Sequence, residues 1–127
     1  MIIFARKLRE MGGRVIKTEE EVESFLRQFK PKFKLWGIIF LNRDKNLEAL
    51  KALGITPKAR EEIIADIGAD DYVETIMDAI PFGKMWVFEK DYDNTELYIK
   101  ISMGKPDSNT ICILFHVAGH RLGYAFK

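Results

Sequence analysis

Three side chains in the C-terminal third of the sequence could move protons and stabilise negative charge together: Tyr98, Lys100 and His116. Histidine has a reference pKa of about 6.5 and is the usual proton carrier. A tyrosine hydroxyl can donate a proton, and a lysine supplies a fixed positive charge. These residue types suit metal-free cleavage of RNA, in which the 2′-hydroxyl attacks the neighbouring phosphate and a positioned acid and base assist.

Two other interpretations of these residues stay open. A tyrosine, a lysine and a histidine can form the solvated face of a sheet without any chemical role. His116 and His120 are four residues apart, a spacing that suits a metal only within a helix. Because His116 ends a predicted strand and Gly119 intervenes before His120, we expect no metal site here. We also expect no cofactor.

Three predicted strands position these side chains. Lys84 to Asp91 predicts a strand, and Glu96 to Met103 and Thr110 to His116 alternate with period 2. The connections between them predict an antiparallel meander.

Alternation along the second and third strands assigns the side chains to two faces. One predicted face is apolar and must meet the helices; it holds Leu97, Ile99, Ile101, Met103, Ile111, Ile113 and Phe115. The other predicted face carries Tyr98, Lys100 and Ser102 with Cys112, Leu114 and His116.

The sequence ahead of the sheet is predicted to be mainly helical. Thr18 and Glu21 form a capping box before an amphipathic helix that Pro31 is expected to end or kink. Leu35 to Leu41 then predicts a buried extended segment or strand. Further helices are expected from about Arg43 to Leu53 with Gly54 as C-cap, after Thr56-Pro57, and from Asp71 to about Met77 with Asp70 as cap. Helices followed by strands predict an α+β fold.

Composition bounds the class of protein. The 127 residues are 47% hydrophobic and 31% charged, which predicts a single globular domain over 1–127 with a helical N-terminal addition at 1–41, helices at 42–83 and an antiparallel sheet at 84–127. No apolar run is long enough for a membrane helix, and the lone Cys112 allows no internal disulfide. We therefore expect a cytoplasmic protein with no membrane partner.

Charge is unevenly distributed. Residues 1–60 carry a net charge of +7 and residues 61–127 a net charge of −6. The basic half could attract a polyanion such as RNA, or the two halves could attract each other. Arg43 and Lys45 are candidate phosphate contacts, and His120 and Arg121 are candidates to assist the catalytic face or bind RNA.

A set of short motifs resembles one known family. In order and spacing, residues 42–118 resemble the MqsR family of toxins, through the fragments Arg43 to Leu50, Leu53 to Thr56, Asp70 to Tyr72, Met85 to Phe88, Leu97 to Ile101 and Leu114 to His116. The resemblance implies a RelE-like fold, metal-independent cleavage of mRNA and inhibition by a protein antitoxin. It implies that Tyr98 and Lys100 match the family's Tyr-x-Lys strand, and that His116 falls where the best-known branch has a basic residue.

The chain departs from that branch at two positions. The branch has a lysine after its Asp-aromatic pair, where this chain has Val73 and Glu74, and a glutamine after the tryptophan, where this chain has Val87. These departures favour an alternative function, a non-catalytic RelE-like module that binds a protein or RNA. The predicted partners are an RNA substrate and an antitoxin, and association into a homo-oligomer stays open.

Overall fold

The structure is a computed structural model that describes residues 13–119 and 123–127. Within these residues the helices are α2 (Glu19–Trp36), α3 (Asp44–Leu53) and α4 (Pro57–Ala65), with a 3-10 turn η1 (Ala69–Asp71). The strands are β1 (Arg14–Val15), β2 (Ile38–Phe40), β3 (Tyr72–Ala79), β4 (Gly83–Tyr92), β5 (Thr95–Ser102) and β6 (Thr110–Val117). The predicted α+β class is confirmed.

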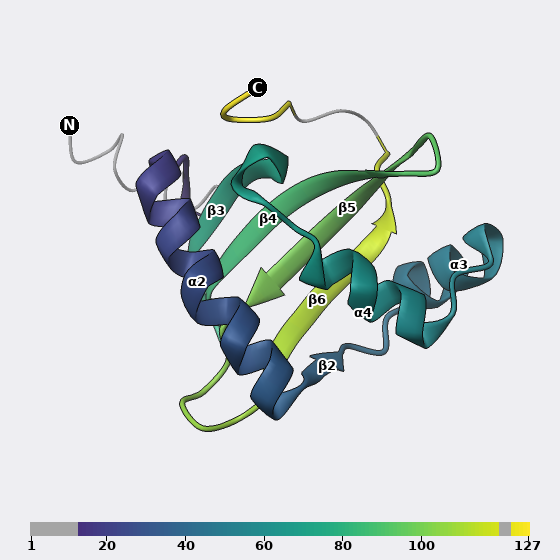
Figure 1. The fold of residues 1–127 in the computed structure, drawn as a ribbon, viewed down its shortest axis with the longest axis horizontal. Coiled ribbons are helices and arrows are strands. Elements are labelled where there is room, and N and C mark those ends of the chain that lie inside the picture. The colour runs from purple at the N-terminus through teal and green to yellow at the C-terminus, as the bar shows by residue number, and fades with distance from the viewer. Residues whose placement is uncertain (1–12, 120–122) are drawn as a thin grey trace.

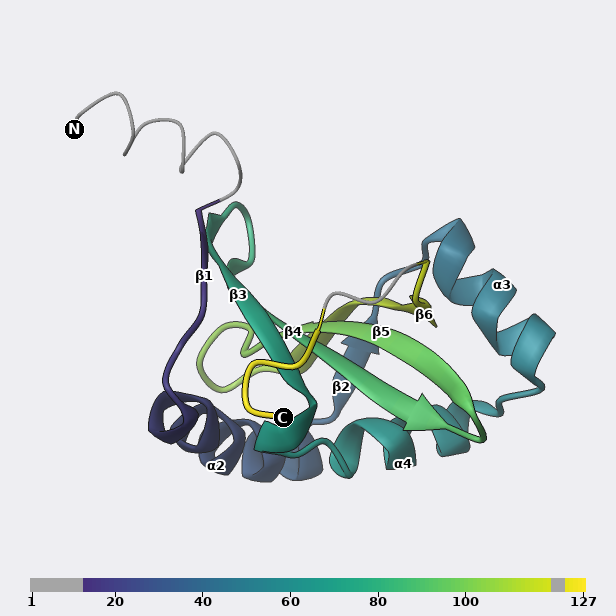
Figure 2. The same cartoon turned by 90° about the horizontal axis from the view of Figure 1, so that it is seen from above.

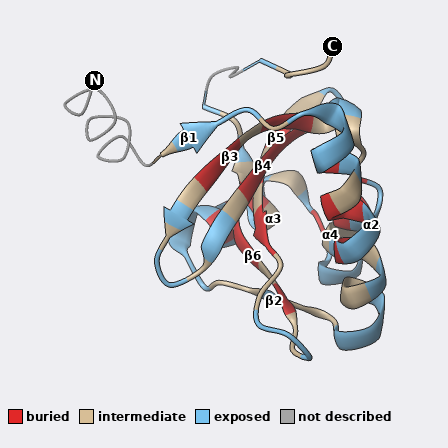
Figure 3. Ribbon diagram, turned by 90° about the vertical axis from the view of Figure 1, so that its left-hand side faces the viewer, coloured by how far each residue is buried: buried red, intermediate tan, exposed pale blue. Residues whose placement is uncertain are grey.

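The described strands form one six-stranded sheet in the order β1-β3-β4-β5-β6-β2; Figure 1 shows β3 to β6 and β2, and Figure 3 shows β1 beside β3. Strands β3 to β6 make an antiparallel meander, which confirms the predicted pairing of the last three strands and adds a fourth. At the β6 edge, β2 pairs in parallel with residues 110–112. The short β1 pairs antiparallel with β3 at the opposite edge.

Helices α2 and α4 cover one face of the sheet, which we call the helix-covered face (Figures 1 and 2). The core lies between these two helices and the sheet, and Figure 3 shows buried strand residues lining this layer. It is built from helix residues such as Phe25 and Ile64 and strand residues such as Phe88, Ile99 and Phe115. Figure 2 shows α3 on the other side of the sheet, beside β6, where it flanks what we call the open face.

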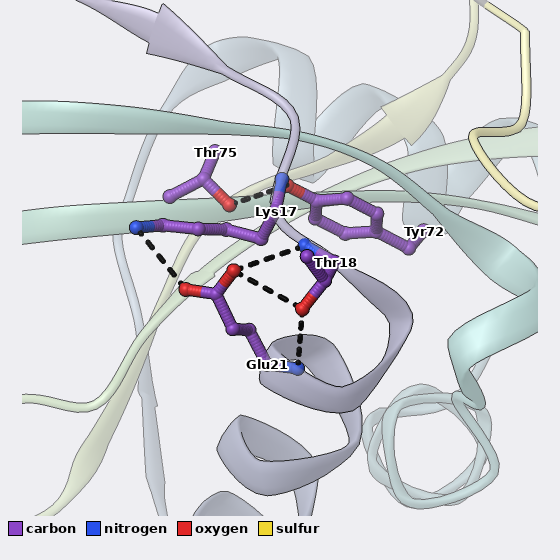
Figure 4. Close-up of polar contacts among 5 residues, drawn as sticks. All are labelled: Lys17, Thr18, Glu21, Tyr72 and Thr75. Carbon is purple, nitrogen blue, oxygen red and sulfur yellow. Dashed lines mark hydrogen bonds and ion pairs between the residues drawn. The ribbon is translucent and has the colours of Figure 1, made fainter.

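Helix α2 begins as predicted. The Thr18 hydroxyl accepts a hydrogen bond from the backbone N–H of Glu21, and the Glu21 carboxylate accepts one from the N–H of Thr18 (Figure 4). The preceding segment is tied to the sheet, because the N–H of Lys17 donates to the Tyr72 hydroxyl at 3.0 Å. That hydroxyl also lies 2.7 Å from the Thr75 hydroxyl.

Pro31 was predicted to end or kink this helix, and it does not end it. Pro31 lies on the exposed side of α2, and the helix continues for five more residues. Tertiary contacts on both sides of the proline explain this: Phe29 is buried, Phe33 packs on the core, and the Lys32 ammonium donates to the carbonyls of Met103 and Lys105. Because α2 ends at Trp36, the strand predicted over 35–41 is limited to β2, and Leu35, Trp36 and Ile39 are exposed rather than buried.

The next two helices agree with their predicted ends. Gly54 takes the left-handed conformation at φ 65° after α3, and the Thr56 hydroxyl caps α4 by accepting from the N–H of Ala59.

The helix predicted over Asp71 to Met77 is wrong. Asp71 ends η1, and Tyr72 begins strand β3. Val73, Thr75 and Ile76 are β-branched and favour a strand. Tyr72 packs into the main core, whereas Val73 and Ile76 join a second apolar cluster with Val87 on the open face. Apolar residues on both faces of one strand imitate the spacing of a helix.

Candidate active site

Tyr98 and His116 lie directly opposite each other on β5 and β6. Their rings are stacked, with centroids 5.1 Å apart and planes 13° apart. Lys100 lies two residues along β5 on the same face, and its ammonium nitrogen is 5.7 Å from the centre of the Tyr98 ring. The structure therefore brings the three predicted catalytic residues together on the open face.

The His116 ring has a defined orientation. Its Nδ1 lies 2.8 Å from the carbonyl oxygen of Val117. Because a carbonyl can only accept, Nδ1 carries the hydrogen, and Nε2 of the neutral ring is left as the proton acceptor.

A β-bulge in β6 changes one predicted face. Lys100 pairs with Leu114 but Ile101 pairs with Cys112, so Ile113 is an extra residue in β6. Cys112 therefore turns into the core and does not share the face of His116, contrary to the prediction. Burial raises the pKa of its thiol above the usual range, which leaves it an inert packing residue.

Asn46 of α3 holds the bulge in place. Its side-chain amide donates to the carbonyls of Leu41 (2.9 Å) and Ile113 (3.2 Å), and its oxygen accepts from the N–H of Phe115 (2.8 Å). This buried side chain continues the edge pairing of β6 where β2 stops. Asn46 thereby fixes both the position of α3 and the strand that carries His116.

A cleft of about 610 Å³ opens above the stacked rings. Arg14 of β1 lines it from one side, Tyr98 and His116 line it from the sheet, and Lys45 and Glu48 of α3 line the other side. Its cationic residues Arg14 and Lys45 come from opposite sides of the cleft, one from β1 and one from α3. Its volume lies in the range of small-ligand sites.

The site shifts the proton affinities of two of its residues in opposite directions. Burial raises the pKa of the Tyr98 hydroxyl, helped by the nearby Glu74 carboxylate and opposed by Arg14. Burial lowers the pKa of the Lys100 ammonium, and the positive charges of Arg14 and Arg43 act in the same direction. Tyr98 is thus held as a proton donor at neutral pH.

The predicted RNA-binding residues fall into two groups. Lys45 lines the cleft, and Arg43 is exposed and close enough to act electrostatically on Lys100. His120 and Arg121 lie outside the described residues.

Three charged residues, Arg14, Glu74 and Glu89, were not placed in this site from the sequence. Arg14 forms an ion pair with Glu74, with 3.2 Å between Nη1 and Oε2. Glu89 lies opposite Tyr98 in the register of β4 and β5 and is fully buried. The alternation of β4 could have placed Glu89 on this face, but only the pairing of β1 with β3 brings Arg14 to it.

Comparison of the chain with protein-family models, curated proteins and solved structures found no match. Among the described residues there is no helix with the length and apolar character needed to cross a membrane, and no cluster of three or more His, Cys, Asp or Glu side chains that could hold a metal ion.

Proposed function

We propose that this protein is a metal-independent endoribonuclease whose active site is the cleft on the open face. The observation that carries the proposal is the stacked pair of Tyr98 and His116 beside Lys100, facing a cleft lined by Arg14 and Lys45. The pair joins a proton acceptor and a proton donor, and the cations suit a phosphate backbone.

In the proposed reaction, His116 Nε2 accepts the proton of an RNA 2′-hydroxyl as that oxygen attacks the adjacent phosphorus. The Tyr98 hydroxyl donates a proton to the departing 5′-oxygen, and the Lys100 ammonium stabilises the negative charge of the phosphorane. The phosphorus–oxygen bond to the 5′-oxygen breaks, which leaves a 2′,3′-cyclic phosphate and a 5′-hydroxyl. Because the pKa of Tyr98 is raised, its hydroxyl carries a proton at neutral pH, which is the state that this step requires.

The test is cleavage of end-labelled RNA by the purified protein in EDTA, compared with Tyr98→Phe and His116→Ala. The expected result is cutting by the wild type and a loss of roughly 10²–10⁴ in rate in each variant. Tyr92→Phe is the matched control, because Tyr92 lies at the end of β4 and packs against the core. Equal cutting by wild type and Tyr98→Phe would contradict the proposed role of the hydroxyl.

The biological role that we propose is that of an mRNA-cleaving toxin restrained by a protein antitoxin, as the resemblance to the MqsR family implies. Support comes from the Tyr98-x-Lys100 strand and from His116, which share one face as that assignment requires. Expression without an antitoxin should arrest growth, whereas Tyr98→Phe should not. Arrest that is as strong with Tyr98→Phe would argue against toxicity by this site.

A second candidate function is that of a non-catalytic module that binds RNA or protein. Glu74 and the fully buried Val87 favour it, because they place a carboxylate and an apolar side chain where the related branch has a lysine and a glutamine. RNA binding without cutting by the wild type, in the same assay, would support this function over cleavage.

A further inference from the structure

We infer that Arg14 is a phosphate-binding residue of the cleft, that Glu74 positions it, and that an RNA strand lies across the open face between Arg14 and Lys45. The inference rests on the proposed function for the identity of the ligand. Arg14 lies in the N-terminal segment that the motifs of residues 42–118 do not cover.

The placement of Arg14 follows from strand pairing. Arg14 lies opposite Ile76, whose side chain belongs to the apolar cluster of the open face. Paired residues of an antiparallel ladder project to the same face, so Arg14 projects over the open face from the sheet edge. Its side chain reaches the cleft that Tyr98 and His116 also line.

Glu74 restricts where the guanidinium can go. Its side chain is only 16% exposed, whereas that of Arg14 is 56% exposed. The ion pair therefore anchors an exposed, flexible arginine to a nearly buried carboxylate. A guanidinium has five N–H donors, so one contact with Glu74 leaves others to bind a phosphate, and an anchored side chain loses less entropy on binding.

Arg14 is also close enough to act on the reacting groups. Its positive charge lowers the pKa of both Tyr98 and Lys100. Lys45 stands across the cleft on α3. A strand with one phosphate on each of these two cations would cross over the stacked rings, and the phosphate between those two would be the scissile one.

The first measurement is binding of a fluorescein-labelled 2′-O-methyl RNA oligonucleotide, which lacks the nucleophile, by anisotropy at several salt concentrations. Arg14→Gln should weaken binding and reduce the slope of log K against log salt by about one, whereas Arg14→Lys should retain the slope. Arg27→Gln is the matched control, because Arg27 is an exposed arginine of α2 paired with Glu23. It should leave the slope unchanged.

Glu74→Gln tests the positioning role. Removing this carboxylate should tighten binding of the oligonucleotide, because a negative charge is removed from beside Arg14, yet lower kcat on unmodified RNA by about tenfold, because the guanidinium is no longer held in one position. If Glu74 had only a structural role, Glu74→Gln would not combine tighter oligonucleotide binding with a lower kcat. Glu74→Gln that leaves kcat unchanged overturns its positioning role.

The outcomes for the inference and for the proposed function are separable. If the wild type binds but does not cut unmodified RNA, the proposed function fails while the binding series still decides the role of Arg14. If the wild type cuts RNA and Arg14→Gln retains wild-type affinity and salt slope, Arg14 is not a phosphate contact and the proposed function stands. Failure of the wild type to bind the oligonucleotide overturns the inference as well.

Discussion

Tyr98 and His116 occupy opposite positions on two neighbouring strands, and their rings stack at 5.1 Å. Stacking restricts the orientation of each ring. The Tyr98 hydroxyl and His116 Nε2 can therefore contact a substrate from the same face of the sheet. The bulge at Ile113 lies between the Lys100–Leu114 pair and the Ile101–Cys112 pair, so the register of β6 from Leu114 to His116 depends on how the bulge is held.

The stacked pair should be measurable as a coupling energy. In a double-mutant cycle, Tyr98→Ala and His116→Ala should show an interaction of about 0.5–1.5 kcal/mol in the free energy of unfolding, because an aromatic pair contributes beyond its buried area. Urea denaturation measures it. A control cycle of Tyr92→Ala with His116→Ala should be additive within about 0.5 kcal/mol. Additivity in both cycles would mean that the stack contributes nothing to stability.

Replacing Lys100 should stabilise the protein and remove activity. Burial disfavours its charged form, so Lys100→Met should raise the free energy of unfolding at pH 7 by about 0.5–2 kcal/mol while RNA cleavage is lost. Lys90→Met should not stabilise, because Lys90 is paired with Asp66 at 3.1 Å and Asp71 at 3.4 Å. Thermal unfolding measures the expected gain in stability, and the cleavage assay measures the expected loss of activity.

The Lys100 effect has a predicted dependence on pH. The pKa of Lys100 in the folded protein is below its ordinary 10.5, so between these two values the unfolded chain binds more protons and the stability contributed by this group rises with pH. The stability advantage of Lys100→Met should therefore shrink as pH rises toward 10.5. An advantage that grows over this range would contradict the assignment.

Asn46 should be among the most sensitive positions for stability. Asn46→Ala removes a side chain that bonds the carbonyls of Leu41 and Ile113 and the N–H of Phe115, and should cost about 2–4 kcal/mol because buried backbone groups lose their partners. Asn42→Ala, at an exposed position, should change stability by no more than about 0.5 kcal/mol. Urea denaturation of both variants distinguishes the loss of these three hydrogen bonds from the loss of any asparagine side chain.

The Tyr72 hydroxyl should link stability to the placement of Arg14. Tyr72→Phe leaves the N–H of Lys17 and the Thr75 hydroxyl without this partner, and should cost about 1–3 kcal/mol. Because Lys17 follows β1, the same variant should weaken RNA binding through Arg14, and combining it with Arg14→Gln should give little further loss. Losses in affinity that simply add would indicate that this anchor does not act through Arg14.

Pro31 offers a stabilising substitution. The proline leaves one helical carbonyl without its usual N–H partner, so Pro31→Ala should raise the free energy of unfolding by about 1–3 kcal/mol. Lys30→Ala is the adjacent control and should lie within about 0.5 kcal/mol of the wild type. A destabilised Pro31→Ala protein would show that the proline is needed for the path of α2.

Several features were predictable from the sequence because they depend on neighbours three or four residues away. The Thr18 capping box, the Gly54 C-cap and the Thr56-Pro57 helix start all have the local bonds that their sequences predict. Alternation is equally local, which is why Tyr98 and Lys100 were assigned correctly to one face. The meander followed because short connections join neighbouring strands.

Tertiary structure decided the features that depend on distant partners. Residues 72–79 have helical spacing, but they pair with β1 on one side and β4 on the other, which makes them a strand with apolar contacts on both faces. The bulge that turns Cys112 inward depends on Asn46, 67 residues before Ile113. Arg14 reaches the cleft only through the β1–β3 pairing. The sequence by itself determined the starts of α2 and α4, the C-cap of α3 and the alternation of β5. The C-terminal end of α2, strand register, the bulge in β6 and the convergence of charges required contacts between segments that local patterns do not encode.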